Sequence, residues 1–236
     1  MNLAYVGSNV RASAVAMDKG VAKLLFKTVD LPVAEGLTLA ADMDVETAEA
    51  MILERFGDRV VIKPLSQGSA IGVTPIANGG DLKPAIRTAQ MHGAFLVEPY
   101  VLGREITVGV FDPEGQQPIA FPVIEIRTGT DQWYDFTNRY AVGASEHIIP
   151  ALLPDPVNLE LQHIAIAAHR VLGCRDLSRA DFIVTDSNDI VLLEVNTLPG
   201  MTPTSLYPDG ARAMGMDFAT LMDALVRSAH RRSQKS

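Results

Sequence analysis

Residues 178–184 read Ser178-Arg179-Ala180-Asp181-Phe182-Ile183-Val184, and after the turn-forming Asp186-Ser187-Asn188-Asp189 a second apolar run contains Leu193-Glu194-Val195-Asn196. Two such runs around a turn predict a β-hairpin, in which pairing could bring Asp181 opposite Glu194. Side chains alternate along a strand, so Glu194 and Asn196 should point the same way. Carboxylate and carboxamide oxygens are hard ligands suited to Mg²⁺, which often shares its coordination shell with substrate phosphates. The hairpin therefore predicts a metal and phosphate site, unless these residues simply end two strands at a solvated rim.

The composition is that of an ordinary globular protein. The 236 residues, 47% hydrophobic and 20% charged, can form a large core in one or two domains. A formal net charge of -8 argues against wholesale nucleic-acid binding, which usually requires a basic face. No apolar run approaches a membrane span, the N-terminus lacks the regions of a signal peptide, and the single Cys174 fits a reduced compartment. We therefore expect a cytoplasmic protein without nucleic-acid or membrane partners.

The order of the predicted elements favours an α+β fold. Periodicity predicts helices over residues 13–26, 45–56, 81–91, 159–172 and 218–229, and short apolar runs predict strands over 59–62, 94–97, 104–111 and 119–126. Several neighbouring strands are joined by tight turns, which favours α+β over a doubly wound parallel sheet. Residues 128–148 form a long polar segment, and loops of that length are often functional lids. Two lobes with a cleft between them would suit this order.

Two further segments carry residues suited to a nucleotide. Lys63 ends a buried run and precedes a Gly-Ser loop at residues 66–73, so its ammonium and the N–H groups of the loop could bind phosphates. A Lys-Pro pair before a glycine turn is also a common structural feature. Glu98 and Glu105 lie in a segment that joins two strands and could bind adenosine, with Glu98 accepting from the exocyclic amine and Glu105 from ribose hydroxyls. Neither segment identifies a ligand in isolation.

Ordered motifs across almost the whole chain resemble the D-alanine–D-alanine ligase family, ATP-grasp enzymes of peptidoglycan precursor synthesis. The motifs are Tyr5-Val6-Gly7-Ser8, Met17-Asp18-Lys19, Val61-Ile62-Lys63-Pro64, Gly68-Ser69-Ala70-Ile71-Gly72, residues 98–105, Tyr134-Asp135-Phe136 to Tyr140, and residues 194–206. The resemblance implies an α+β, ATP-grasp fold with the nucleotide between two α+β subdomains. Residues 1–16 would be a remnant of the connection from the family's N-terminal preATP-grasp domain, which we do not expect within this sequence. Residues 17–97 would form the central subdomain and 98–236 the C-terminal subdomain with the catalytic and metal site.

The same resemblance implies the ligands and the residues that bind them. The ligands are ATP, two Mg²⁺ ions, for which Mn²⁺ is a possible substitute, and two molecules of D-alanine. ATP would be bound by Lys19, Lys63, Glu98, Tyr100, Val101 and Glu105, and the metal by Asp181, Glu194 and Asn196. Catalysis would involve Ser69, Arg139, Tyr140, Arg179 and Gly200, and the carboxylate of the second D-alanine would bind Ser205 and Leu206. The first D-alanine carboxylate would attack the γ-phosphate, and the amine of the second would displace the resulting acylphosphate.

The resemblance also gives residues 128–148 a role as the mobile ω-loop of the family, which places Tyr140 against Ser69. Relatives that use D-lactate typically lack this tyrosine, so Tyr140 favours an amine as second substrate. Arg139 stands where the family usually has a lysine; the charge is preserved, although a guanidinium differs in geometry from an ammonium. We expect no loss of activity from this difference.

Two alternatives stay open. The chain could join other amino or hydroxy acids on the same fold. It could instead be a non-catalytic module that binds Mg-ATP, because the glutamate that binds the first D-alanine's ammonium belongs to the family's N-terminal domain. We expect a homodimer for a full-length form. For this chain alone we expect poor solubility or dimerisation, since the surface that normally meets that domain would be exposed.

Overall fold

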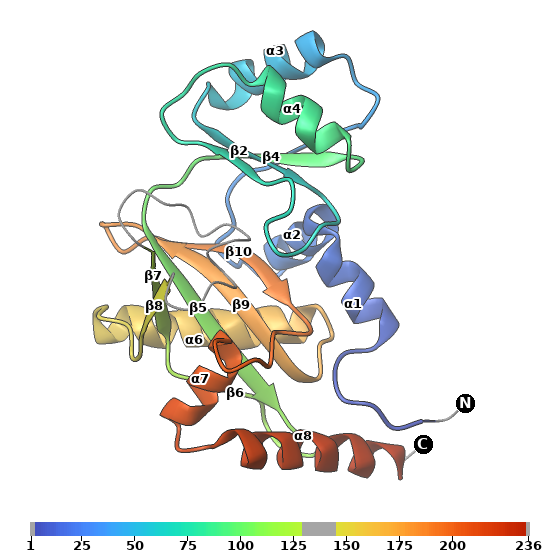
Figure 1. The fold of residues 1–236 in the computed structure, drawn as a ribbon, viewed down its shortest axis with the longest axis vertical. Helices are drawn as coiled ribbons and strands as arrows, with labels where there is room; N and C mark the ends of the chain where they lie inside the picture. Colours follow the sequence, from blue (N-terminus) through green and yellow to red (C-terminus); the bar gives the residue numbers. More distant parts are fainter. Residues whose placement is uncertain (1–2, 129–144, 235–236) are drawn as a thin grey trace.

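The computed structural model describes residues 3–128 and 145–234, which form two lobes built on two antiparallel sheets (Figure 1). The predicted α+β architecture is therefore confirmed. The smaller lobe lies at the top of the view and the larger lobe below it, and the chain passes between them twice, at residues 28–36 and again at residues 100–103. The N- and C-terminal ends lie side by side at the base of the larger lobe (Figure 1).

The smaller lobe is a four-stranded sheet covered by two helices. The strand order is β1-β4-β2-β3, formed by β1 (Leu37–Leu39), β4 (Phe95–Pro99), β2 (Val60–Pro64) and β3 (Thr74–Ile76). Helices α3 (Val45–Phe56) and α4 (Lys83–Gln90) pack on the sheet, and their apolar side chains join those of β2 and β4 in one core cluster. The predicted sequence of strand, glycine loop and strand is present as β2, residues 65–73 and β3.

The larger lobe is a sheet of six strands with helices on both faces. Its strands follow the order β10-β9-β5-β7-β8, with β6 paired to β5: β10 (Ile190–Asn196), β9 (Asp176–Val184), β5 (Arg104–Asp112), β7 (Ile124–Thr128), β8 (Ser145–Ile148) and β6 (Ile119–Ala120). On one face, α6 (Asp155–Val171) shares a core with α1 (Val10–Met17) and α2 (Lys19–Lys27). On the other, α7 (Leu206–Ala213) and α8 (Phe218–Ser233) form a second core. Strand β5 alternates between the two cores, as side chains on a strand do.

Two predicted elements are wrong in detail. The helix predicted over 13–26 is two helices, because Asp18 adopts an extended conformation and its side chain accepts from the N–H of Val21 at 3.0 Å as the N-cap of α2. The strand predicted over 119–126 is divided into β6 and β7 around Phe121, whose ring packs against Tyr207 with centroids 4.9 Å apart. Strands β1 and β8 and helix α7 had no predicted counterpart, and β8 forms the end of the segment 128–148 that was predicted to be a loop.

The packing of α2 bears on the division of the chain into subdomains. Its buried Ala22 and Phe26 belong to the core of the larger lobe, although the predicted central subdomain begins at residue 17. The division at 16/17 and 97/98 stays a prediction. Where the lobes connect, a Cβ on Gly103 would lie 2.5 Å from the carbonyl oxygen of Val184. Only glycine allows the connecting chain to lie this close to the end of β9.

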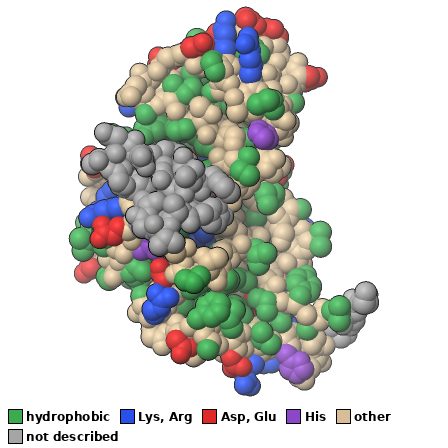
Figure 2. Space-filling model, in the orientation of Figure 1, with side chains coloured by type: hydrophobic (Ala, Val, Ile, Leu, Met, Phe, Trp, Pro, Cys, Tyr) green, Lys and Arg blue, Asp and Glu red, His purple; other side chains and the backbone are tan. Residues whose placement is uncertain are grey.

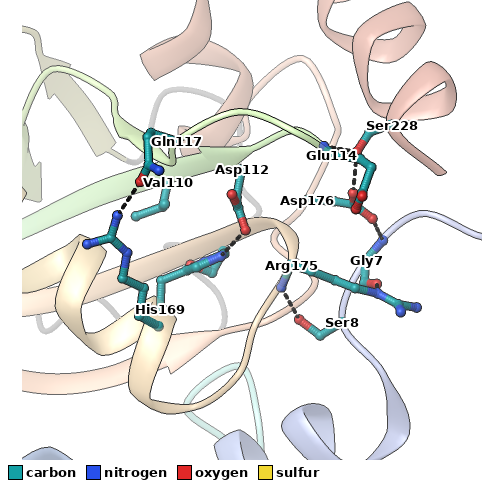
Figure 3. Close-up of polar contacts among 12 residues, drawn as sticks. Gly7, Ser8, Val110, Asp112, Glu114, Gln117, His169, Arg175, Asp176 and Ser228 are labelled. Carbon is teal, nitrogen blue, oxygen red and sulfur yellow. Dashed lines mark hydrogen bonds and ion pairs between the residues drawn. The ribbon is translucent and has the colours of Figure 1, made fainter. Parts of the chain in front are cut away.

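A buried carboxylate connects the two ends of the chain (Figure 3). Asp176 is fully buried at the start of β9 and accepts hydrogen bonds from Gly7 N at 2.8 Å and from Ser228 Oγ at 2.6 Å. Arg232 donates to both of its oxygens at 2.8 Å and to the carbonyl of Tyr5 at 2.8 Å. Burial alone would raise the pKa of Asp176, but the hydrogen bonds from Arg232, Ser228 and Gly7 outweigh it and lower the pKa. The N-terminal segment and α8 are therefore fixed to the sheet through one anion.

Replacing Asp176 by asparagine should lower the free energy of unfolding by about 2 kcal/mol at pH 7, since Arg232 loses its buried counter-ion but stays partly accessible to water. Asparagine tolerates the left-handed backbone at this position, where φ is 63°. The lowered pKa means that the carboxylate stabilises the fold above its ordinary pKa of 3.8 and loses that effect as the pH falls further. The difference between the two proteins should therefore shrink below that pH. Urea unfolding at neutral and acidic pH measures it, with Asp223→Asn, in the exposed pair with Arg227, as a control that changes stability by less than about 0.5 kcal/mol.

Apolar side chains are visible on both lobes in the space-filling view (Figure 2). On α1 and α2, Val10 is 84% and Leu24 65% exposed. The expected poor solubility or dimerisation of the chain stays a prediction. None of the helices within residues 3–128 and 145–234 is long and apolar enough to cross a membrane.

Candidate active site

Two adjoining cavities lie where the lobes meet. The larger, of about 300 Å³, is enclosed by α1, the loop after β2, the end of β10 and the start of α7. The smaller, of about 90 Å³, is enclosed by β2, the segment after β4 and the hairpin β9–β10. Lys19, Gln67 and Glu194 line both cavities. A ligand in either cavity would therefore be close to these three residues, which also face the other cavity.

The predicted hairpin places its polar residues as expected. Strands β9 and β10 pair with Glu194 opposite Asp181 and Asn196 opposite Arg179, which confirms the predicted juxtaposition of the two acids. A register shift between Leu192 and Glu194 interrupts the ladder just before the site. Such bulges commonly redirect side chains next to functional sites.

The two predicted metal-binding acids of the hairpin each have a basic partner. Arg179 donates to the two carboxylate oxygens of Asp181 at 2.8 and 2.7 Å, and Thr107 on β5 donates to Asp181 Oδ1 at 2.6 Å. Lys19 Nζ lies 3.3 Å from Oε2 of Glu194. Bidentate pairing fixes the plane of the Arg179 guanidinium, whose side chain is only 11% exposed. The hairpin and Lys19 on α2 thus place two pairs of opposite charges along the walls of the two cavities.

The donor set fits magnesium better than a softer metal. Among the residues that the structure describes, no group of three or more His, Cys, Asp and Glu side chains is placed to hold a metal ion. The predicted set contains only oxygen donors, the carboxylates of Asp181 and Glu194 and the amide oxygen of Asn196. That oxygen accepts from the N–H of Leu198 at 3.0 Å, which fixes the amide. Magnesium uses few protein carboxylates and takes its remaining ligands from water and phosphate, so this set suits it.

Three buried charges meet at the smaller cavity. Glu98 at the end of β4 is 3% exposed, and its two oxygens form separate ion pairs with Lys23 and Lys63, which are 6% and 7% exposed. Burial alone would raise the pKa of Glu98, but Lys63 and Lys23 outweigh it and lower the pKa. Burial lowers the pKa of Lys23, and the adjacent Glu98 opposes this. Glu98 and Lys63 were predicted as ligands, whereas Lys23 was missed, because helical spacing alone did not reveal that its face is buried against the other lobe.

The loop after β2 is anchored from α2. Lys19 donates its backbone N–H to the carbonyl of Leu65 at 3.1 Å and its ammonium to the carbonyl of Gln67 at 2.7 Å. Ser69 has a left-handed φ of 53° and lines the larger cavity. A Cβ on Gly72 would lie 2.8 Å from Pro64, so this close turn requires glycine. The loop therefore lines both cavities beside Lys19.

The far end of the larger cavity is formed by residues 200–206. Gly200, Ser205 and Leu206 all line it, and Ser205 is the N-cap residue of α7. Ser205 Oγ lies 2.9 Å from the N–H of Thr202 and 2.8 Å from its hydroxyl. A Cβ on Gly200 would approach Ser205 Oγ to 2.8 Å. The N-terminus of α7 and its hydroxyl groups thus offer donors to a small anion.

The other predicted residues fall into three groups. Tyr100 and Val101 line the smaller cavity, but the N–H of Tyr100 already donates to the carbonyl of Arg59 at 2.9 Å. Glu105 lies on β5 and does not line either cavity, so its contact with ribose stays a prediction. Arg139 and Tyr140 lie outside the described residues, as does most of the predicted ω-loop.

Comparison with known proteins gives one consistent result. The family model described as "D-ala D-ala ligase C-terminus" matches residues 25–227. A "D-alanine--D-alanine ligase" from Acidiphilium cryptum is 45% identical over 231 residues, which are 97% of this chain and 72% of that protein. The VanG D-Ala:D-Ser ligase from Enterococcus faecalis superposes with a TM-score of 0.82 at 30% identity, covering 95% of this chain and 64% of that one. A Bacillus anthracis D-alanine–D-alanine ligase complexed with ATP gives 0.80 at 26% identity, covering 99% and 72%. The chain thus spans roughly two thirds to three quarters of these proteins.

Proposed function

This chain belongs to the D-alanine–D-alanine ligase family and has its ATP-grasp fold, and from that premise we propose that it joins two D-alanines at the expense of ATP for peptidoglycan precursor synthesis. The observation that carries the proposal is the pair of cavities that share Lys19 and Glu194. A nucleotide in the smaller cavity would present its terminal phosphate at this shared wall. Amino acids in the larger cavity would meet it there, as transfer of a phosphoryl group to a carboxylate requires.

The lining of the smaller cavity suits part of an ATP molecule by its charge and chemistry. Its lining combines the cationic Lys63 with apolar side chains and with the Tyr100-Val101 segment that follows β4. Lys19, anchored on the glycine loop, would face the same phosphates from α2. The structure of the B. anthracis relative is a complex with ATP, which supports this ligand for a chain of the same fold. Glu98 would contribute to adenine binding with the oxygen lone pairs that its lysine partners leave.

Two Mg²⁺ ions would be held by Asp181, Glu194 and Asn196. When bound, such ions neutralise the charge that develops on phosphate oxygens during transfer. The chain itself supplies a second source of positive charge there, because Lys19 lies beside Glu194 and Arg179 beside Asp181. The pair of Lys19 and Glu194 would then exchange partners with the incoming phosphate and metal, while Asp181 would continue to orient Arg179.

Joining the two amino acids calls for donors to a developing oxyanion. Arg179 and Gly200 line the larger cavity, and the Arg179 guanidinium and the N–H of Gly200 would suit this role. The carboxylate of the second D-alanine would bind at the start of α7, where Ser205 lies at the N-cap and Leu206 begins the helix. Ser69, Arg139 and Tyr140 would act from the loops that cover the cavity, and water excluded by them would not reach the acylphosphate.

Replacing Gly200 by alanine should raise the KM for D-alanine at the second site by about tenfold, the value of roughly one hydrogen bond, while the KM for ATP changes little. The added Cβ would displace Ser205 Oγ, which it meets at 2.8 Å. Ser205→Ala should shift the same KM in the same direction, because it removes the same hydroxyl. Initial rates at varied D-alanine and saturating ATP measure the effect. An unchanged KM in both variants would contradict the placement of the carboxylate at α7.

The proposed activity is tested by incubating the chain with ATP, Mg²⁺ and D-alanine and measuring both ADP and dipeptide. ADP release that depends on D-alanine, with D-alanyl-D-alanine as product, is the expected result, and a version extended upstream serves as comparison. Turnover with another amino or hydroxy acid but not with D-alanine would overturn it. D-serine is the first such substrate to include, because a relative of this fold is a D-Ala:D-Ser ligase. Nucleotide binding without turnover in either version would favour a non-catalytic module.

We also propose a cytoplasmic location, where ATP is available and Cys174 would stay reduced. As partners we propose the small-molecule substrates named above. For a full-length form we propose a homodimer. Sedimentation of this chain and of an extended version would test the oligomeric state, and a monodisperse monomer for the extended version would contradict the dimer.

A further inference from the structure

Lys23 does not itself line the nucleotide cavity, but its side chain is held in place by residues around it. Its ammonium pairs with Oε1 of Glu98 and donates to the carbonyl of Ala34 at 2.9 Å. The side chain arises from α2, whose neighbouring Ala22 and Phe26 are part of the core of the larger lobe. Glu98 and its other partner, Lys63, belong to the sheet of the smaller lobe. Lys23 therefore crosses from one lobe to the other and ends on the acid of a buried ion pair.

The charge balance of this cluster is unusual for a protein interior. Two ammonium groups share one carboxylate, and all three side chains are at most 9% exposed. A buried charge without a counter-ion is unfavourable, so an excess cation at this depth favours an anion close by. Lys63 and Glu98 line the smaller cavity, which is the open side of the cluster. With Lys63 and Glu98 alone the pair would be neutral and would offer a polyphosphate no net attraction.

We propose that Lys23 is a positioning residue for nucleotide binding: by holding one oxygen of Glu98, it prevents that carboxylate from neutralising Lys63 and leaves a net positive charge at the wall of the nucleotide cavity. This inference rests on the proposed function, because it takes the anion in the cavity to be the polyphosphate of ATP. Lys23 itself does not touch the nucleotide. Its effect on the phosphates is indirect, because the negative charge of Glu98 is shared between two lysines.

A purely structural role makes a different prediction, because a tether between lobes needs a hydrogen-bond donor but no charge. Lys23→Gln separates the two, since its amide can still donate to Glu98 or Ala34 but carries no charge. Lys23→Arg keeps the charge and the donors. Lys27→Gln, an exposed lysine one turn further along α2, makes the same chemical change outside the ion pairs of the cluster and is the matched control.

The experiment measures the dissociation constants of adenosine, ADP and a non-hydrolysable ATP analogue by calorimetry on the complete chain and its variants, with thermal melting as a check of folding. Lys23→Gln should weaken binding of the ATP analogue by about tenfold, with a smaller loss for ADP and less than about twofold for adenosine. Lys23→Arg should stay within about threefold of the unaltered chain, and Lys27→Gln should not change binding.

Three results would overturn the inference. The first is unchanged binding of the ATP analogue in Lys23→Gln. The second is an equal loss for adenosine and the ATP analogue, and the third is an equal loss in Lys23→Gln and Lys23→Arg. If Lys23→Gln does not fold, the same comparison is made between Lys23→Arg and Lys23→Met, in which Glu98 keeps Lys63 as its partner. Failure of the unaltered chain to bind any nucleotide would instead overturn the proposed function, and the inference with it.

Discussion

Arg179→Met should reduce kcat for dipeptide formation by roughly 10³-fold, the upper range for removing one donor to an oxyanion. Arg179 is buried in the wall of the larger cavity, and its guanidinium is held by Asp181 through two hydrogen bonds at 2.8 and 2.7 Å. A group held in this way does not need to reorganise as charge develops on the substrate. The KM for ATP should change much less, because the nucleotide cavity does not include Arg179. Initial rates at saturating ATP and D-alanine measure kcat.

The Arg179 variant also removes the partner of a carboxylate, so folding has to be measured beside the rate. Arg179→Lys preserves the charge but not the bidentate geometry and should recover only part of the rate. Arg227→Met removes an arginine from an exposed ion pair on α8 and should leave kcat unchanged. A folded Arg179→Met protein with undiminished kcat would contradict the role in oxyanion stabilisation.

The hairpin was predictable because its determinants are local. Two apolar runs around Asp186-Ser187-Asn188-Asp189 establish the pairing, and the observed register places Asp181 opposite Glu194 as the sequence suggested. The glycine loop was predictable for a similar reason, because its glycines are visible in the local sequence. In the structure, the turn at Gly72 leaves no room for a side chain. The resemblance of the ordered motifs to one ligase family was likewise present in the sequence, and the comparisons confirm it.

The features that sequence reasoning missed depend on residues far apart in the chain. Lys23 becomes a buried charge only because α2 packs against one lobe while Glu98, 75 positions later, belongs to the other. The ion pair of Arg179 with Asp181 was not predicted for a different reason. Arg179 was assigned to catalysis and Asp181 to the metal, although residues two apart on a strand share a face and can pair. The bond between Asp176 and Gly7 spans 169 positions, and no local pattern marks it.

Glu194→Gln should raise the Mg²⁺ concentration needed for half-maximal activity by about 100-fold or more and lower kcat at saturating Mg²⁺. Changes to groups that only support metal ligands already cost 10- to 100-fold in affinity, and a direct ligand should cost at least roughly as much. Glutamine keeps the size and one oxygen of the side chain, so the effect isolates the charge. Activity and nucleotide binding titrated with Mg²⁺, and separately with Mn²⁺, measure it.

The matched control for Glu194→Gln is Asp189→Asn at the tip of the same hairpin. Asp189 accepts from Ser187 Oγ at 2.6 Å in an exposed turn, so its loss removes one negative charge from the hairpin without touching either cavity. An unchanged dependence on Mg²⁺ in Glu194→Gln would contradict the metal site.

A second expected result of Glu194→Gln distinguishes the loss of metal binding from the mere loss of one negative charge. Glu194 is also the partner of Lys19, at 3.3 Å, so its neutralisation frees that ammonium for phosphate. Nucleotide binding without Mg²⁺ should therefore become tighter in Glu194→Gln while Mg²⁺-dependent turnover falls, two opposite changes that a merely misfolded site would not produce together.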